Sequence, residues 1–462
     1  MHDDPSVISE NTATGEEDAL TPELVRAVSG AIEARSRTDI LDLTADLHSA
    51  DMADLLELLK PEFRGGLIDL LGTSFDVEAV TELDEQLRDA VMERLPNENI
   101  AEAVKDLETD DAVYLLEDLG EGDRTEILEA LPALERANVQ RSLEYPEDSA
   151  GRLMQTDFVA VPPFWTIGQT IDYMREEDDL PDDFYEIFVV DPTFHLIGTV
   201  PLGHILRTRR PVRIEAVMKR EQTEISALID QEQVAHMFAQ YNLVSAAVVD
   251  EDRRIVGVVT VDDIVDVIQE EAEEDIHRLA GVGDEELTSS VWQTARSRWT
   301  WLAVNLVTAI FASAVIGLFD ATISQMVALA ILMPIVASMG GNAATQTMTV
   351  AVRAMATHTL GPMNAMRVIV REMLVGLLNG VSFAIAMGGI TMIWFSDVKL
   401  GLVIGGAMII NHFVAGLAGI VVPLALEKAG ADPAIASTAF VTTVTDVVGF
   451  FSFLGLAALF LF

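Results

Sequence analysis

The sequence predicts a multidomain fold with three structured parts: an all-α domain of helical hairpins, a duplicated α/β unit, and an α-helical membrane domain with five transmembrane helices. Three observations predict it. Apolar residues recur at helical spacings over residues 21–148, an α/β pattern occurs twice within residues 149–268, and five long apolar runs follow residue 296. Of the 74 acidic and 29 basic residues, all but six acidic and seven basic ones precede Arg296.

The acidic front half limits the partners that the chain can have. Its field repels nucleic acids and attracts cations, so we expect no nucleic-acid partner and a cationic one instead. Adaptation to a salt-loaded cytoplasm is the alternative explanation, because the chain holds five Lys against 24 Arg. The lack of cysteine suits an intracellular protein. Residues 1–20 are polar and acidic without an apolar segment, which predicts a disordered acidic tail rather than a signal peptide.

Residues 21–148 are the predicted helical N domain. Segments such as ADLLELLK, GGLIDLLG and AVYLLEDL place apolar residues three and four apart, as one face of a helix requires. Proline and glycine breaks cut the pattern into short helices, which predicts stacked helical hairpins. These breaks are Pro61, Gly65, Gly72, Pro96, Gly120 and Pro132. Nothing in this part resembles a catalytic site.

Residues 149–268 contain an internal repeat. FVVDPTFHLIGTVPLGHIL, from Phe188, aligns without gaps to AVVDEDRRIVGVVTVDDIV, from Ala247, and each copy predicts a helix, two strands and a second helix. This arrangement resembles a tandem pair of cystathionine-β-synthase (CBS) domains. In GVVTVDD, Thr260 and Asp263 match the nucleotide-binding motif of that family, whereas the first copy departs from it. The resemblance implies at most one ATP site, and a purely structural turn is the alternative.

Residues 269–295 continue as a polar helix that connects to the membrane domain. Five acidic residues crowd into two turns, where like charges at these spacings repel one another. They are Glu270, Glu271, Glu273, Glu274 and Asp275. A solvated connector explains such a run, and so does repulsion that a bound cation relieves.

Residues 296–462 form the predicted membrane domain. Each of the five apolar runs reaches the roughly 20 residues that cross a hydrocarbon layer. Because five is odd, the two ends face opposite sides. Basic residues gather before the first run and around the second loop, so the positive-inside rule places the N-terminal part in the cytoplasm and the C-terminus outside. These residues are Arg296, Arg298, Arg353, Arg367 and Arg371.

Two of the apolar runs carry a polar stripe. The last run spaces Thr438, Thr442, Thr445, Asp446 and Gly449 at helical intervals. The second run does the same with Ser338, Asn342, Thr345, Gln346 and Thr349, next to the pair Gly340–Gly341. A carboxylate in lipid is costly, so such stripes line a water-filled path or a helix interface. Carboxylate, amide and carbonyl oxygens suit Mg²⁺, Mn²⁺ or Ca²⁺, while a proton relay and a helix-bundle hydrogen bond remain alternatives.

PIVASMGGNAATQ and ADPAIASTAFVTTVTDVVGFF resemble the paired signatures of the MgtE family of Mg²⁺ channels, and the order of domains is similar along nearly the whole chain. The resemblance implies a homodimer around one pore, in which Asp446 of each chain binds a hydrated Mg²⁺. It implies further metal-binding residues in the pore, at its mouth and in the cytosolic sensor. These are Asn342, Gly341, Thr442, Asp432, Asp230, Glu232, Asp263, Asp266, Glu271, Glu274, Asp275, Asp110 and Asp111. Ala344 and Asn242 depart from the family pattern.

Together with these residues, the resemblance implies a Mg²⁺-selective channel of the plasma membrane that mediates Mg²⁺ uptake. Cytosolic Mg²⁺ would close it by bridging the acidic N domain, the CBS pair and the connector. A secondary transporter of divalent cations, coupled to Na⁺ or H⁺ through Asp446, is the alternative. A nucleotide-sensing protein with the spans as an anchor is a further one. The sequence has no phosphate-binding P-loop or catalytic constellation, so no enzymatic activity is expected.

Overall fold

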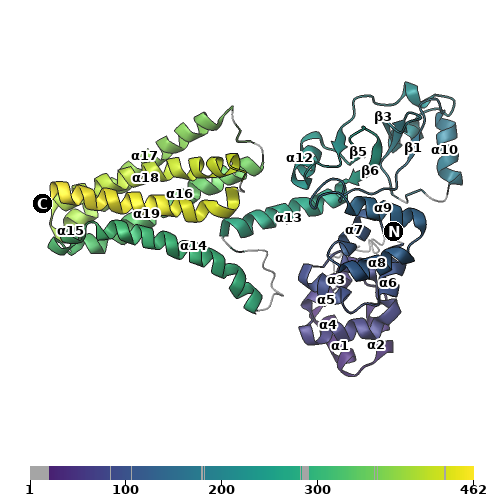
Figure 1. The fold of residues 1–462 in the computed structure, drawn as a ribbon, viewed down its shortest axis with the longest axis horizontal. Helices are drawn as coiled ribbons and strands as arrows, with labels where there is room; N and C mark the ends of the chain where they lie inside the picture. The colour runs from purple at the N-terminus through teal and green to yellow at the C-terminus, as the bar shows by residue number, and fades with distance from the viewer. Residues whose placement is uncertain are drawn as a thin grey trace, which may run out of the picture. The chain divides into compact units, whose positions relative to one another are not determined.

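The computed structural model describes residues 20–462, except residues 84, 106, 178–179, 182, 281, 283–290, 358, 362 and 431–432. The expected tail of residues 1–20 and the site residue Asp432 therefore lie outside the described residues, apart from Leu20. The chain divides into two compact units, Met1–Ile268 and Gln269–Phe462. Figure 1 shows the elements of both units.

Short helices make up the N-terminal part of the first unit, as the leucine pattern predicts. Thr21 illustrates how they begin, since its hydroxyl accepts a 3.2 Å hydrogen bond from Leu24 N and Pro22 occupies the first turn. Leucine, isoleucine and valine side chains from these helices form one buried core. The helices are α1 (Pro22–Glu33), α2 (Arg37–Thr44), α3 (Ser49–Leu58), α4 (Pro61–Leu71), α5 (Glu85–Met92), α6 (Asn97–Ala103), α7 (Thr109–Leu116), α8 (Glu121–Ala130) and α9 (Ala133–Leu143), with the 3₁₀ turns η1 (Gly72–Ser74) and η2 (Val77–Val80).

The α/β repeat folds into two three-stranded sheets of the same design. In each, a short first strand pairs parallel with the second, and the second pairs antiparallel with the third, as Ala160↔Phe188 and Glu224↔Ala247 illustrate. The sequence did not predict the first strands, which are only two and three residues long. The elements are β1 (Ala160–Val161), α10 (Ile167–Glu176), β2 (Glu186–Val190), β3 (Leu196–Pro201), α11 (Leu202–Arg207), η3 (Ile214–Ala216), β4 (Glu224–Ser226), α12 (Gln231–Tyr241), β5 (Ser245–Val249) and β6 (Ile255–Thr260).

A single helix, α13 (Val261–Ala280), contains both the last helix of the repeat and the first part of the connector. The sequence placed these in separate segments. The helix runs through the acidic residues from Glu270 to Asp275, and the described helix ends at Ala280. The rest of the predicted connector, residues 281 and 283–290, lies outside the described residues.

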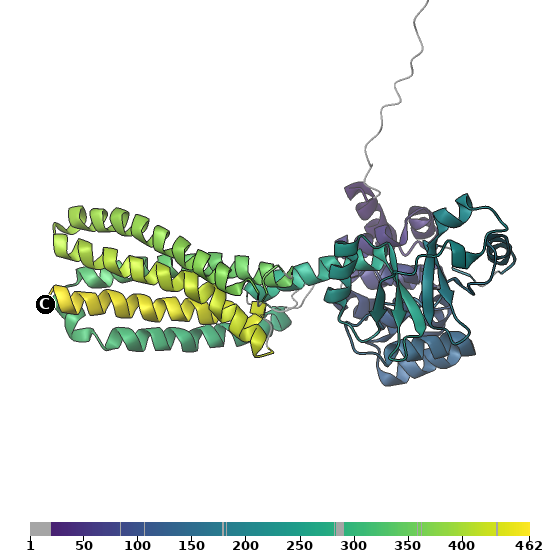
Figure 2. The same cartoon turned by 90° about the horizontal axis from the view of Figure 1, so that it is seen from above.

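The second unit contains five helices long and apolar enough to cross a membrane, counted over the described residues. They run side by side in both views (Figures 1 and 2). Of these helices, α18 has the largest buried share, and its glycines allow close packing against α17. The helices are α14 (Val291–Gly317), the short α15 (Asp320–Gln325), α16 (Ala328–Ala356), α17 (Ala365–Phe395), α18 (Val398–Lys428) and α19 (Pro433–Phe460). The predicted fold class is thus confirmed.

Candidate functional site

Asp446 lies in the middle of α19 and is half-buried. Among the described residues, none forms a hydrogen bond or an ion pair with its carboxylate. The neighbouring hydroxyls are occupied by their own helix, because Thr442 donates to the carbonyl oxygen of Thr438 at 2.8 Å and Thr445 donates to that of Thr442 at 2.9 Å. Asp446 is therefore an acid in a membrane-length helix without a partner in the described part of its own chain.

The predicted stripe of α19 does not lie on one face. Thr445 is 0% exposed and packs into the bundle, whereas Thr442 and Asp446 are half-buried. On α16, Ser338, Asn342, Gln346 and Thr349 are exposed and Thr345 is half-buried, so this stripe does form one open face of the single chain.

The pair Gly340–Gly341 lies within an unbroken helix, Ala328–Ala356. The two glycines therefore do not open the backbone of this helix toward a cavity. Gly340 instead accommodates the side chain of Asn411, which occupies the place where a Cβ atom would lie. Gly341 has no neighbour in the corresponding position and lies next to the open face that carries Asn342.

Sequence reasoning missed a set of buried polar residues in the membrane helices. Asn411 and His412 on α18 are 0% and 1% exposed, and Glu372 on α17 is also buried. Asn411 Nδ2 donates to the carbonyl oxygen of Val336 at 2.9 Å, and His412 Nδ1 donates to that of Met408 at 2.9 Å. The signal was the adjacent pair Asn411–His412 within an otherwise apolar run.

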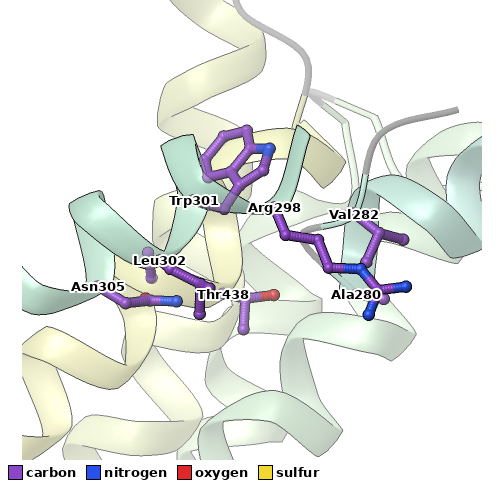
Figure 3. Close-up of a pocket in the computed structure, with 8 residues that line it drawn as sticks. Ala280, Val282, Arg298, Trp301, Leu302, Asn305 and Thr438 are labelled. Atoms are coloured by element: carbon purple, nitrogen blue, oxygen red, sulfur yellow. The ribbon is translucent and has the colours of Figure 1, made fainter. Parts of the chain in front are cut away.

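The end of α13 and the start of α19 meet at a cavity of about 170 Å³. The Thr438 hydroxyl donates a 3.0 Å hydrogen bond to the carbonyl oxygen of Leu279. Arg298, Trp301 and Asn305 on α14 line the other side of the cavity (Figure 3). The final turn of the acidic helix α13 is thus attached to the helix that carries Asp446.

An acidic cluster, Glu108, Asp110, Asp111 and Asp263, forms in the first unit. Asp110 is 8% exposed, its Oδ1 has no hydrogen-bond partner among the described residues, and its carboxyl group lies near that of Asp263. Burial and then repulsion from Asp263 raise the pKa of Asp110 well above its ordinary value. The same two causes raise the pKa of Glu108 to about 7 and that of Asp111 to about 6. Burial also raises the pKa of Asp263 to about 6, against the opposing hydrogen bond from Thr260.

The cluster lies where the helical domain contacts the α/β repeat. Gln155 Nε2 donates to Glu108, and the hydroxyls of Thr109 and Thr156 are 2.7 Å apart. Carboxylates are thus held together at a contact between two parts of one unit, where a cation would relieve their mutual repulsion.

The other predicted sensor residues are placed differently. Asp230 caps α12, because its side chain accepts a 3.0 Å hydrogen bond from the backbone N–H of Glu232. Glu274 forms an ion pair with Arg278 on the next turn of α13. Glu271, Glu274 and Asp275 belong to the second unit, whereas Asp263 and Asp266 belong to the first. Within the described ranges, no three His, Cys, Asp or Glu side chains are close enough to hold a metal ion directly.

The residues of the predicted nucleotide motif contact each other. The Thr260 hydroxyl donates a 2.7 Å hydrogen bond to Asp263 Oδ2. Thr260 also lines a cleft of about 20 Å³, together with the aromatic residues Phe158 and Tyr185. Its described lining also includes Asp157, Asp183 and Glu186 and no Lys, Arg or His. The cleft is too small for a purine as it stands, and its carboxylates oppose the phosphates of a free nucleoside triphosphate.

Comparison with known proteins identifies each part of the chain. A family described as MgtE, divalent cation transporter, matches residues 333–456, the MgtE intracellular N domain matches residues 47–148, and CBS domains match residues 150–210 and 214–270. The chain is similar to "Magnesium transporter MgtE" of Thermus thermophilus, with 30% identity over 96% of this chain and 99% of that protein.

It is also 27% identical to "Magnesium transporter MgtE" of Bacillus subtilis, over 92% of this chain and 94% of that protein. The solved cytosolic domain of the Mg²⁺ channel MgtE in complex with ATP matches with 27% identity and a TM-score of 0.49, over 53% of this chain and 99% of that one. The family matches cover most of the N domain, the CBS pair and both membrane signatures, and the similarity to the Thermus protein extends over 96% of the chain. The chain therefore belongs to the MgtE family of divalent cation transporters.

Proposed function

We propose that the protein is a Mg²⁺-selective channel that mediates Mg²⁺ uptake and is gated by cytosolic Mg²⁺. One observation carries the proposal: Asp446 has no partner among the described residues of its chain, although an unpaired acid in lipid is costly. A cation in a water-filled path supplies the missing partner. Two relatives that match more than 90% of the chain are named as magnesium transporters.

The proposed pore forms between two copies of the chain. The exposed polar face of α16, which carries Asn342, would be unstable in contact with lipid. In a homodimer, this face and Asp446 would line one path from both sides, with Gly341 and Thr442 close by. Mg²⁺ loses its waters reluctantly, so a ring of oxygens around a hydrated ion would distinguish it from other cations. The basic residues near the ends of α14, α16 and α17 favour a cytoplasmic N-terminus in the plasma membrane.

The acidic cluster is the proposed cytosolic sensor. Glu108, Asp110, Asp111 and Asp263 are held together although their charges repel, as their raised pKa values indicate. A hydrated divalent ion bound there, and others near Asp230, Glu232, Asp266 and the acids of α13, would stabilise the closed arrangement. Asp432 would belong to the mouth of the same path. Several weak sites with different affinities for the closed and open states supply a steep response.

ATP is the proposed second ligand of the CBS pair, beside Thr260 and Asp263. Because the described lining of the cleft is acidic, we expect it to bind as its Mg²⁺ complex rather than as the free anion. Titration of the full-length protein with ATP, in Mg²⁺ and in a chelator, tests this. Equal binding in both conditions would contradict it.

Recording from the purified protein in lipid bilayers tests the main proposal. With Mg²⁺ as the charge carrier, current should follow the Mg²⁺ gradient alone and should fall as cytoplasmic Mg²⁺ rises. Asp446→Asn should abolish the current, and Asp320→Asn, on short helix α15 outside the predicted stripes, is the matched control. A reversal potential that shifts with Na⁺ or pH would favour the secondary transporter. Unchanged current in Asp446→Asn would overturn both.

A further inference from the structure

Asn411 has an unusual environment for a residue at the centre of a membrane helix. Its side chain is 0% exposed and lies between α16 and α19. The amide Nδ2 donates to the Val336 carbonyl oxygen on α16 at 2.9 Å, and the amide oxygen Oδ1 is buried without a partner in the described part of the chain. A leucine would fill a similar volume without leaving a buried oxygen unsatisfied, so packing alone does not explain an asparagine here.

Two glycines create the space that Asn411 occupies. On α19, a Cβ atom at Gly449 would lie 2.8 Å from Asn411 Nδ2, and the three atoms nearest to it all belong to Asn411. On α16, a Cβ atom at Gly340 would overlap the same amide group. The asparagine is therefore in direct contact with the backbones of both helices at once.

Both contacts lie within one helical turn of a proposed pore residue. Gly449 follows Asp446 by three residues, which places the two on neighbouring parts of the α19 surface. Gly340 precedes Asn342 by two residues, so Asn411 contacts the face of α16 that is roughly opposite to Asn342. The amide group thus touches both proposed pore helices at the level of their polar residues, on α16 from the side away from the open face and on α19 next to Asp446.

We propose that Asn411 is a positioning residue for ion selection: it fixes the spacing and rotation of α16 relative to α19, and thereby the distance between Asn342 and Asp446. The inference rests on the proposed function, because it assigns a supporting role for the same permeation site. A site that discriminates between ions must be held to within about 0.5 Å by packed and hydrogen-bonded neighbours. A directional hydrogen bond to a backbone carbonyl fixes helix rotation, which apolar contact alone does not.

The first test is Asn411→Leu, which keeps the volume and removes the donor. We expect the variant to assemble and to transport Mg²⁺ with a half-saturating concentration changed by at least about fivefold and a discrimination against Ca²⁺ reduced by a similar factor. Its maximal rate per folded molecule should change less. A merely structural role would reduce the amount of folded protein and leave the half-saturating Mg²⁺ concentration and the discrimination against Ca²⁺ at the parent values. That result would overturn the proposal.

The second test uses the geometry directly. Gly449→Ala should clash with the amide and impair ion discrimination, whereas the double variant Gly449→Ala with Asn411→Ala removes the clashing group and should discriminate no worse than Asn411→Ala alone. Gly389→Ala is the matched control, since a Cβ atom there meets nothing within 4 Å. Additive losses in the double variant would overturn the proposal. If neither Asn411→Leu nor the double variant is recovered as folded protein, Asn411 acts on stability and the proposal fails as well.

Asp446→Asn, measured in the same assay, separates this inference from the proposed function. If Asp446→Asn transports like the parent, the proposed path itself is wrong. If Asp446→Asn is inactive and the Asn411 variants discriminate between ions like the parent, only the positioning role is wrong.

Discussion

The Thr438 hydroxyl donates a 3.0 Å hydrogen bond to the carbonyl oxygen of Leu279, and this contact joins the last turn of α13 to the beginning of α19. Leu279 also packs against an apolar cluster that includes Ala344, Met348 and Val441. Thr438 lies eight residues before Asp446, about 12 Å along the helix. A change in the position of the end of α13 can therefore act on the helix that carries Asp446 through a short and continuous connection.

Thr438→Val removes the donor and preserves the shape of the side chain. Because a hydrogen bond of this kind contributes about 0.5–1.5 kcal/mol, we expect closure to need roughly two- to tenfold more cytoplasmic Mg²⁺. Thr443→Val is the matched control, since among the described residues its hydroxyl bonds only to the Ala439 carbonyl oxygen of its own helix. Current measured against cytoplasmic Mg²⁺ checks the prediction, and equal shifts in the two variants would contradict it.

Gly416→Ala should destabilise the membrane unit. A Cβ atom at Gly416 would lie 2.5 Å from the backbone oxygen of Glu372, which cannot move without shifting α17. Overpacking of this kind costs about 1–3 kcal/mol, which corresponds to a melting temperature lower by roughly 5 °C. Heating the detergent-solubilised protein and measuring the fraction that stays monodisperse checks this. Gly389→Ala, which has free space, should melt with the parent, and a parallel loss there would refute the packing argument.

The sequence predicts those features that depend on local pattern. The order of domains, the repeat, the five apolar helices and the placement of Asp446 and Asn342 on polar stretches follow from spacing along one segment. Asn411 could not be placed in this way, because Gly340 and Gly449 are distant from it in the chain and only tertiary packing brings the three together. The burial of Thr445 was missed for the same reason, since spacing alone does not show which side of a stripe faces a neighbouring helix.

The acidic cluster of the first unit also depends on tertiary packing that sequence spacing does not predict. Asp110 and Asp263 were both candidate residues, but they come from different predicted domains, and only the fold brings their carboxyl groups near each other. Glu108 was not a candidate, because a single acid at the start of a helix is common in sequences. Its role becomes visible only when the contact with Gln155 places it beside the other carboxylates.

Arg152 should hold the helical domain against the α/β repeat. Its guanidinium forms a 2.9 Å ion pair with Glu117 and donates to the backbone oxygens of Tyr145 and Leu143. Arg152→Met leaves Glu117 partly buried and unpaired, so we expect opening of the contact to become easier by about 2–3 kcal/mol. Hydrogen exchange of peptides from α7 and α9 in the full-length protein measures this.

Arg152→Met with Glu117→Gln should recover part of the loss, because the unpaired charge is gone. Arg254→Met is the matched control, since Arg254 contacts the exposed Asp252 at 3.8 Å and should leave exchange unchanged. If the α7 and α9 peptides of Arg152→Met exchange hydrogen as slowly as those of the parent, the assigned role is contradicted.

In the absence of Mg²⁺, stability of the first unit should fall as pH rises. The folded state raises the pKa of Glu108 to about 7 and those of Asp111 and Asp263 to about 6, above their values in the unfolded chain. At a pH between the unfolded-state and the folded-state pKa values of these groups, the folded state binds more protons than the unfolded state. Stability is therefore lost as pH rises through about 6 to 7. Thermal melting of the full-length protein in a chelator, at pH 5.5 and pH 8, checks the sign.

Mg²⁺ should make the stability of the first unit depend less on pH, because a bound cation replaces the protons that relieve the repulsion between the carboxylates. Glu108→Gln should also reduce the slope, since an amide carries no charge at either pH. Glu102→Gln makes the same charge change at an exposed position paired with Lys105 and should leave the slope unchanged. A melting temperature that rises with pH in the chelator, or equal effects of the two variants, would remove the acidic cluster from the sensing mechanism.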